Sequence, residues 1–135
     1  MGGESVILLD THIWLWMIDA SPRLRPRQIE FIDQNKAGGL GVSIISCWEV
    51  AKLVENGKIG FRQPVIEWIE TALAQPDIHL LPLTPEITVD ATQLPAGFHR
   101  DPADQLIVAT SRVLGIPLLT ADGKILDYPH VSLLK

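Results

Sequence analysis

A run of four apolar residues that ends at an acid constrains the fold of this chain more than any other feature. Residues 6–9 read Val-Ile-Leu-Leu, and Asp10 follows directly. An unbroken apolar run is typical of a strand that is buried on both faces, as in the middle of a parallel sheet. Open α/β sheets bind their ligands in the crevice at the carboxyl ends of such strands. The run therefore predicts a central buried strand that holds a carboxylate in a ligand-binding position.

Further strand-like segments alternate with helix-like segments along the 135 residues. The expected strands cover residues 6–9, 40–45, 78–83, 116–120 and 131–134. The expected helices cover residues 11–17, begin at Pro26, Ser46, Pro64 and Pro85, run from Pro102 to a stop at Gly115, and end with a helical turn at residues 124–127. This alternation predicts a parallel α/β sandwich in three layers with right-handed crossovers. The length predicts one domain over residues 1–135.

Composition narrows the class of protein. The chain is 47% hydrophobic, which excludes a disordered protein, and no apolar run approaches the ~18 residues of a membrane span. No signal peptide precedes the first strand, so we expect a cytoplasmic protein outside the membrane. The single Cys47 excludes an internal disulfide. A net charge of −5 argues against a basic surface over the whole chain but leaves room for a local one.

Three more acids, Glu49, Asp104 and Asp122, follow apolar segments as Asp10 does. Taken one at a time, each acid also fits a structural role. A serine three residues before Glu49 completes the spacing of a capping box. Asp101 can cap the helix that carries Asp104 in its first turn. Asp10 can cap the helix after it, and Asp122 can open the turn that follows it.

Taken together, the four acidic sites indicate a bound cation, because all of them fall at the same end of the predicted sheet. Two carboxylates ~5 Å apart repel by roughly 3 kcal/mol at an effective dielectric constant of about 20. The bases expected nearby are few: Lys52, Arg100 and Lys124. Oxygen ligands suit Mg²⁺ or Mn²⁺, as one ion or two. Such an ion can activate a water and stabilise charge on a phosphoryl group, as in metal-dependent nucleases.

Other chemistries fit the sequence less well. The chain has no glycine-rich phosphate loop of the NTPase kind, and its four histidines lack zinc-site spacing. No second Asp stands two residues after Asp10, as a phospho-aspartyl phosphatase would need. His12 either touches substrate or packs structurally. Thr120 and Ser46 either hydrogen-bond the acids or cap helices.

Four motifs in this order and spacing resemble those of PIN domains, and the similarity covers essentially the whole chain. The motifs are Leu-Leu-Asp-Thr-His at residues 8–12, Ser-Cys-Trp-Glu-Val at 46–50, His-Arg-Asp-Pro-Ala-Asp at 99–104 and Leu-Leu-Thr-Ala-Asp at 118–122. The chain is most similar to the toxins of VapBC type II toxin–antitoxin modules.

The resemblance implies a five-stranded parallel sheet and a Mg²⁺- or Mn²⁺-dependent endoribonuclease that hydrolyses RNA. It also implies a homodimer that is inhibited by a cognate VapB-type antitoxin, whose tail enters the active-site groove. By matching positions, the implied metal-binding and catalytic acids are Asp10, Glu49, Asp104 and Asp122. Asp101 is a fifth candidate, either as a further ligand or only as a helix cap. Gln105 stands where close relatives commonly carry Arg, which removes a positive charge from near the groove.

A catalytically silent interaction module is the alternative, because every acid has a capping explanation. For partner surfaces, the candidates are Trp14, Trp16 and the helix that begins near Pro26. Core packing is the competing interpretation for all the tryptophans, which are Trp14, Trp16, Trp48 and Trp68. The basic run Arg23, Arg25 and Arg27 is either a solvated face or an RNA contact.

Overall fold

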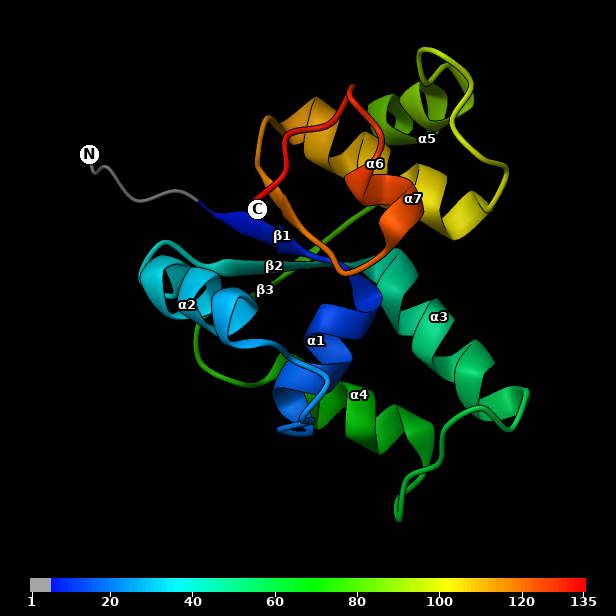
Figure 1. The fold of residues 1–135 in the computed structure, drawn as a ribbon. Coiled ribbons are helices and arrows are strands. Elements are labelled where there is room, and N and C mark those ends of the chain that lie inside the picture. The colour runs from blue at the N-terminus through cyan, green and yellow to red at the C-terminus, as the bar shows by residue number, and fades with distance from the viewer. Residues whose placement is uncertain (1–5) are drawn as a thin grey trace.

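The computed structural model describes residues 6–135 of the chain, in which four strands alternate with seven helices (Figure 1). The strands are β1 (Ile7–Leu9), β2 (Leu40–Ser43), β3 (Ile78–Leu81) and β4 (Leu118–Leu119). The helices are α1 (Thr11–Ile18), α2 (Pro26–Asn35), α3 (Ile44–Glu55), α4 (Val65–Leu73), α5 (Pro85–Thr92), α6 (Pro102–Leu114) and α7 (Gly123–Leu126). The alternation expected from the sequence is therefore present.

The four strands form one parallel sheet in the order β3-β2-β1-β4. Leu8 of β1 pairs with Gly41 of β2 on one side and with Leu118 of β4 on the other. Every residue of β1 is fully buried, so the prediction of a central strand that is buried on both faces is confirmed. Because the strands are parallel, their carboxyl ends lie at one edge, which we call the carboxyl edge.

Helices cover both faces of this sheet. Alternate residues of β1 enter different cores: Ile7 and Leu9 pack among residues of α1 to α4, whereas Leu8 packs with Ile107 of α6 and Ile125 of α7. In Figure 1, α1, α2 and α4 lie below the sheet, and α5, α6 and α7 lie above it. The chain is thus a parallel α/β structure in which β1 belongs to both cores.

The expected fifth strand at residues 131–134 does not form. Leu133 makes one isolated parallel bridge to Leu118. The Leu118 N–H donates to the carbonyl of Ser132, and the Leu134 N–H donates to the carbonyl of Leu118. Since β4 is only two residues long, a neighbouring segment finds no further residues with which to extend a ladder. In the part of the chain that the structure describes, the sheet has four strands rather than five.

The helix expected from Ser46 begins two residues earlier. Ser43 is the N-cap of α3, and its hydroxyl accepts a hydrogen bond from the Ile45 N–H at 3.2 Å. A serine at the end of a strand can satisfy the first free amides of a helix, so the strand stops at Ser43 and not at residue 45. Ser46 is buried inside α3, and the predicted capping box with Glu49 does not form.

The core leaves several large apolar side chains exposed. Trp48, for which core packing was one of two interpretations, is 53% exposed, and Ile29 of α2 is 43% exposed. Ser46 and Val50 occupy the buried side of α3, so Trp48, two positions from each, points to the opposite side. Trp14 is fully buried against Trp68, with ring centroids 5.4 Å apart, and this excludes Trp14 from a partner surface. No helix within residues 6–135 is both long enough and apolar enough to cross a membrane.

Candidate functional site

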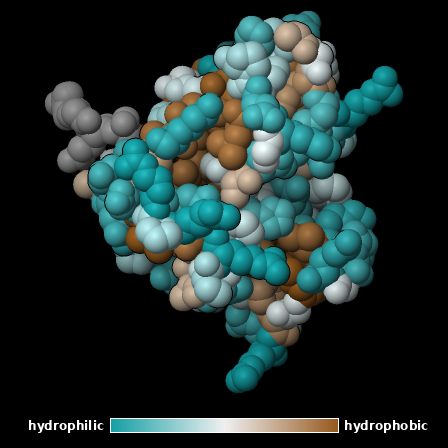
Figure 2. Space-filling model, viewed as in Figure 1, coloured by the Kyte–Doolittle hydropathy of each residue, from teal (hydrophilic) through white to brown (hydrophobic). Residues whose placement is uncertain are grey.

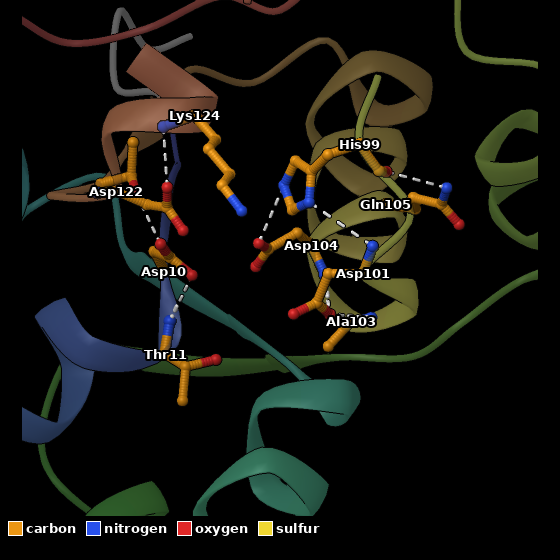
Figure 3. Close-up of polar contacts among 10 residues, drawn as sticks. Asp10, Thr11, His99, Asp101, Ala103, Asp104, Gln105, Asp122 and Lys124 are labelled. Carbon is orange, nitrogen blue, oxygen red and sulfur yellow. Dashed lines mark hydrogen bonds and ion pairs between the residues drawn. The ribbon is translucent and has the colours of Figure 1, made fainter. Parts of the chain in front are cut away.

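All five candidate acids reach the carboxyl edge of the sheet. Asp10 follows β1, Glu49 lies in the second turn of α3, and Asp104 lies in the first turn of α6. Asp101 and Asp122 cap α6 and α7. Figure 3 shows Asp10 and Asp122 on one side of the site, with Asp101 and Asp104 opposite them on the α6 side. The structure therefore brings together residues that are up to 112 positions apart in the sequence.

Hydrogen bonds hold both carboxylate oxygens of Asp10. Oδ1 accepts from the Thr11 N–H at 2.8 Å, and Oδ2 accepts from the hydroxyl of Thr120 at 2.5 Å. The same Thr120 oxygen accepts from the Asp122 N–H at 3.0 Å. Thr120 is 3% exposed and Asp10 is 5% exposed. Thr120 thus ties two of the acids together, which confirms one of its two expected roles.

A short chain of hydroxyl groups positions Glu49. Thr11 Oγ1 donates to Glu49 Oε1, and Ser46 Oγ lies 2.8 Å from Thr11 Oγ1. Because the Thr11 hydroxyl has one proton and gives it to Glu49, Ser46 is the donor of the second bond. Glu49 is therefore held from α1, across 38 positions of sequence, and not by the amide of Ser46 as the capping-box interpretation required.

Asp101 and Asp104 divide two roles at the start of α6. Asp101 is exposed, and its Oδ1 accepts from the N–H groups of Ala103 at 3.0 Å and Asp104 at 3.4 Å, so it is the helix cap. Asp104 is 8% exposed, and its Oδ2 lies 3.1 Å from Nε2 of His99. That pair is within ion-pair distance but is not aligned as a hydrogen bond. His99 Nε2 is buried and has no hydrogen-bond partner among the described residues.

His99 belongs to the third motif, but the sequence analysis gave it no role in the site. Its Nδ1 accepts from the Asp101 N–H at 3.4 Å, which leaves the proton of a neutral ring on Nε2, facing Asp104. The side-chain amide of Gln105 donates to the His99 carbonyl at 3.0 Å and fastens the same loop. The one sign of His99 in the sequence was its position two residues before the helix-capping Asp101. Histidines are common in such loops, so this position did not single it out.

Burial and mutual repulsion raise the pKa values of three of the acids. Burial is the main cause for Asp10, where the hydrogen bonds from Thr120 and Thr11 act in the opposite direction. Burial raises the pKa of Glu49 to about 7, against the effect of the Thr11 hydroxyl, with further contributions from the other carboxylates. Burial followed by the charges of Asp10, Asp101, Asp122 and Glu49 raises the pKa of Asp104 to about 8. A cation at this edge would relieve all these effects.

Few basic groups offset the acids. The Lys124 N–H donates to Oδ1 of Asp122 at 2.8 Å, and Figure 3 shows the Lys124 side chain directed toward the site. Its ammonium group nevertheless makes no ion pair with any residue of the described chain, and neither does Arg100. Lys52 pairs with Glu55 instead. The negative charge of the site is therefore largely uncompensated by protein groups.

The residue types at this edge fit a hard divalent cation, although they do not form a closed cage. All of the candidate ligands are carboxylates, the donor type that Mg²⁺ and Mn²⁺ prefer. Among residues 6–135, no three carboxylate, imidazole or thiol groups are gathered closely enough to ligate one ion directly. Mg²⁺ keeps several of its waters and takes only one or two carboxylates in many sites. The open arrangement therefore suits a partly hydrated ion.

The fold and these motifs define a class of protein. The sequence model described as "PIN domain" matches residues 7–131, and the chain belongs to the PIN-domain family. Within that family it falls in the VapC group, because Ribonuclease VapC22 of Mycobacterium tuberculosis is 33% identical over 126 residues, which are 93% of this chain and 94% of that protein. The resemblance drawn from the four motifs is confirmed.

Solved structures agree with this fold. VapBC2 from Rickettsia felis, bound to a promoter DNA fragment, aligns with a TM-score of 0.69 at 16% identity over 96% of this chain and 97% of that chain. DNA-bound VapBC from Salmonella typhimurium aligns with the same TM-score and identity over 97% of each chain. FitAcB from Neisseria gonorrhoeae aligns with a TM-score of 0.63 at 22% identity over 96% of each.

Proposed function

We propose that this protein is a metal-dependent endoribonuclease and the toxin of a type II toxin–antitoxin module of the VapBC kind. The observation that carries the proposal is the group of carboxylates at the carboxyl edge, where burial and neighbouring acids raise the pKa of Asp104 to about 8. Such a group lowers the stability of the fold, so its presence is best explained by a function that needs it. The relative Ribonuclease VapC22 supports RNA as the substrate.

In this proposal Asp10, Glu49, Asp104 and Asp122 hold Mg²⁺ or Mn²⁺, with Asp101 as a further ligand or only the cap of α6. When bound, the ion supplies an activated water and stabilises charge on the phosphoryl group. The Thr120 hydroxyl orients the Asp10 carboxylate, and the Thr11 hydroxyl orients that of Glu49. Hydrogen bonds of this kind orient metal ligands, and removing one typically lowers metal affinity or activity about 10-fold to 100-fold.

A catalytically silent interaction module is the second candidate, and the capping contacts favour it. Asp10, Asp101 and Asp122 each accept a backbone N–H at a helix start. Glu49 and Asp104 argue against it, because neither accepts a backbone N–H in the part of the chain that the structure describes. A silent module would have no reason to keep the half-buried Glu49 and the buried Asp104.

RNA cleavage by the purified protein tests the proposal. We expect cleavage with Mg²⁺ or Mn²⁺, none in EDTA, and a loss of at least about 100-fold for Asp10→Asn. Asp33→Asn, which changes an exposed acid of α2, is the matched control and keeps its activity. Full activity in EDTA, or an active Asp10→Asn variant, contradicts the proposed function.

We further propose that the protein forms a homodimer and is inhibited by a VapB-type antitoxin. The structures from Rickettsia felis and Salmonella typhimurium are of VapBC complexes, which supports a partner of this kind. Figure 2 shows hydrophilic residues over most of one face, with apolar residues visible mainly in hollows between the helices. One cavity of about 630 Å³ between the ends of α1, α2 and α4 is lined by Met17, Leu24 and the exposed Ile29.

The exposed Ile29 gives this partner surface a test. We expect Ile29→Asp to weaken antitoxin binding by about 10-fold or more in titration calorimetry, since it puts a charge into an apolar contact. Val89→Asp, at a 53% exposed position of α5, is the control. Equal binding by wild type and Ile29→Asp removes α2 from the antitoxin surface. Sedimentation of the protein alone tests the homodimer.

A further inference from the structure

Trp48 is a large aromatic side chain that the fold leaves open to solvent. It is 53% exposed and stands directly before Glu49 on α3. The other tryptophans serve the cores: Trp14 and Trp68 are buried, and Trp16 is half-buried against the first core. Burying an indole side chain is one of the larger sources of stability available to a chain. An indole left outside, next to the acids, therefore calls for a role outside the core.

A cavity lies against Trp48 and reaches the acids. Its volume is about 380 Å³, within the range of sites for small organic groups. Glu49 and Asp101 line one part of it. The rest of the lining is Trp48, His12, Lys52, Asn56, Leu53, Pro102 and Ala103. A group in this cavity would therefore lie beside the acids of the carboxyl edge.

The lining of this cavity combines the aromatic plane of Trp48 with the ammonium group of Lys52 and with polar groups. Lys52 Nζ lies 5.8 Å from the centroid of the Trp48 ring and 2.6 Å from Glu55 Oε1. The Lys52 side chain is 46% exposed, so its ammonium group can reach a phosphate without first being uncovered. His12 is exposed, with its ring centroid 5.7 Å from that of Trp16. Proteins that bind single-stranded nucleic acid use aromatic side chains to stack on the bases and cationic side chains to contact the phosphates.

We propose that this cavity binds one unpaired nucleotide of a single-stranded RNA next to the bond that is cut, with its base stacked on the indole of Trp48. The inference rests on the proposed function and adds a nucleotide-binding subsite at Trp48. In a duplex both faces of a base are already stacked on its neighbours, whereas a base in a loop or a single strand has a face free for Trp48. The charge of Lys52 beside the indole favours a nucleotide over an apolar peptide segment.

Binding to short labelled oligonucleotides tests the stacking role without depending on cleavage. The probe is a fluorescein-labelled single-stranded oligouridylate, measured by anisotropy in Ca²⁺, with gels to verify that it stays intact. We expect Trp48→Ala to weaken binding about 5-fold to 100-fold, as for other bases stacked on aromatic side chains. Trp48→Phe keeps a ring and restores most of the affinity. Ile66→Ala, at a 58% exposed position of α4, is the control for removing an exposed apolar side chain.

The strand dependence separates stacking from a general loss of the fold. We expect a blunt RNA duplex to bind wild type and Trp48→Ala equally, and thermal melts of the two proteins to coincide. An equal loss for duplex and single strand, or an unchanged affinity of Trp48→Ala for the single strand, overturns the inference. Loss of antitoxin binding with unchanged oligonucleotide binding also overturns it, and assigns Trp48 to a protein partner. In all these cases Mg²⁺-dependent cleavage by wild type leaves the proposed function standing, whereas its absence rejects that function separately.

Discussion

The starts of α3 and α6 look alike in sequence and differ in structure. In each, a polar residue stands three positions before an acid: Ser46 before Glu49, and Asp101 before Asp104. Asp101 caps α6 as predicted, whereas Ser46 lies inside α3 and Ser43 caps that helix. Glu49 and Asp104 themselves behave alike. Each contacts a side chain from another element or loop, and neither accepts a backbone N–H of its own helix.

The comparison separates two kinds of acid. A capping acid such as Asp101 stabilises the fold by itself, because it accepts the free amides at a helix start. Glu49 and Asp104 are half-buried and buried beside other carboxylates, and their pKa values rise to about 7 and about 8. Their charged forms lower the stability of the metal-free protein. The second kind is therefore the better guide to the functional site.

The largest effect that we expect is on catalysis, where the two kinds of acid should separate. Asp104→Asn and Glu49→Gln should each lower the initial rate of RNA cleavage in Mg²⁺ by at least about 100-fold. Asp101→Asn should stay within about 3-fold of wild type, because asparagine caps a helix as well as aspartate does. An Asp101→Asn variant as slow as Asp104→Asn would show that Asp101 is a ligand, and would break the comparison.

The next effect is on stability as a function of pH. The folded-state pKa values of Glu49 and Asp104 lie above their ordinary values of 4.5 and 3.8, so the folded protein holds these protons more tightly than the unfolded chain. In EDTA, the free energy of unfolding should therefore fall as the pH rises from about 5 to about 8, by a few kcal/mol in all. Urea unfolding at a series of pH values measures this.

Removing the buried charge provides the control. Asp104→Asn should give a flatter pH profile and, at pH 8 in EDTA, a metal-free protein more stable than wild type. Excess Mg²⁺ at pH 8 should raise the melting temperature of wild type by several degrees, and that of Asp104→Asn by much less. Parallel pH profiles for the two proteins would mean that Asp104 is not a destabilising acid.

The smallest effect should come from the cap. Asp101→Ala removes the side chain that accepts from Ala103 and Asp104, and should cost about 1 kcal/mol of stability with and without Mg²⁺. Chemical denaturation in EDTA and in Mg²⁺ measures both values. A cost that appears only in Mg²⁺ would move Asp101 from the capping acids to the metal ligands.

Much of this architecture follows from local patterns. The apolar run before Asp10 predicted the buried central strand, and Asp101-Pro102 with Gly115 predicted both ends of α6, where Gly115 has a φ of 66°. The predictions failed where competing local signals were equally good. Ser43 and Ser46 both have hydroxyl groups that can cap a helix. The hydroxyl of Ser43 accepts from the Ile45 N–H, whereas that of Ser46 bonds the Thr11 hydroxyl of another helix. The prediction of a fifth strand failed because such a strand has to pair with β4, which is only two residues long. The sequence of β4 did not reveal that it would be so short.

The sequence by itself determined that acids would end the strands of a parallel sheet, because strand periodicity and chain direction put such residues at one edge. Which residue contacts which acid was decided only by the tertiary structure: Thr120 at Asp10, Thr11 at Glu49 and His99 at Asp104. These contacts join side chains from different elements and loops, and in the sequence the contacting residues are ordinary threonines and a loop histidine. The exposure of Trp48 was decided in the same way, since which side of α3 faces the core depends on the packing of its neighbours.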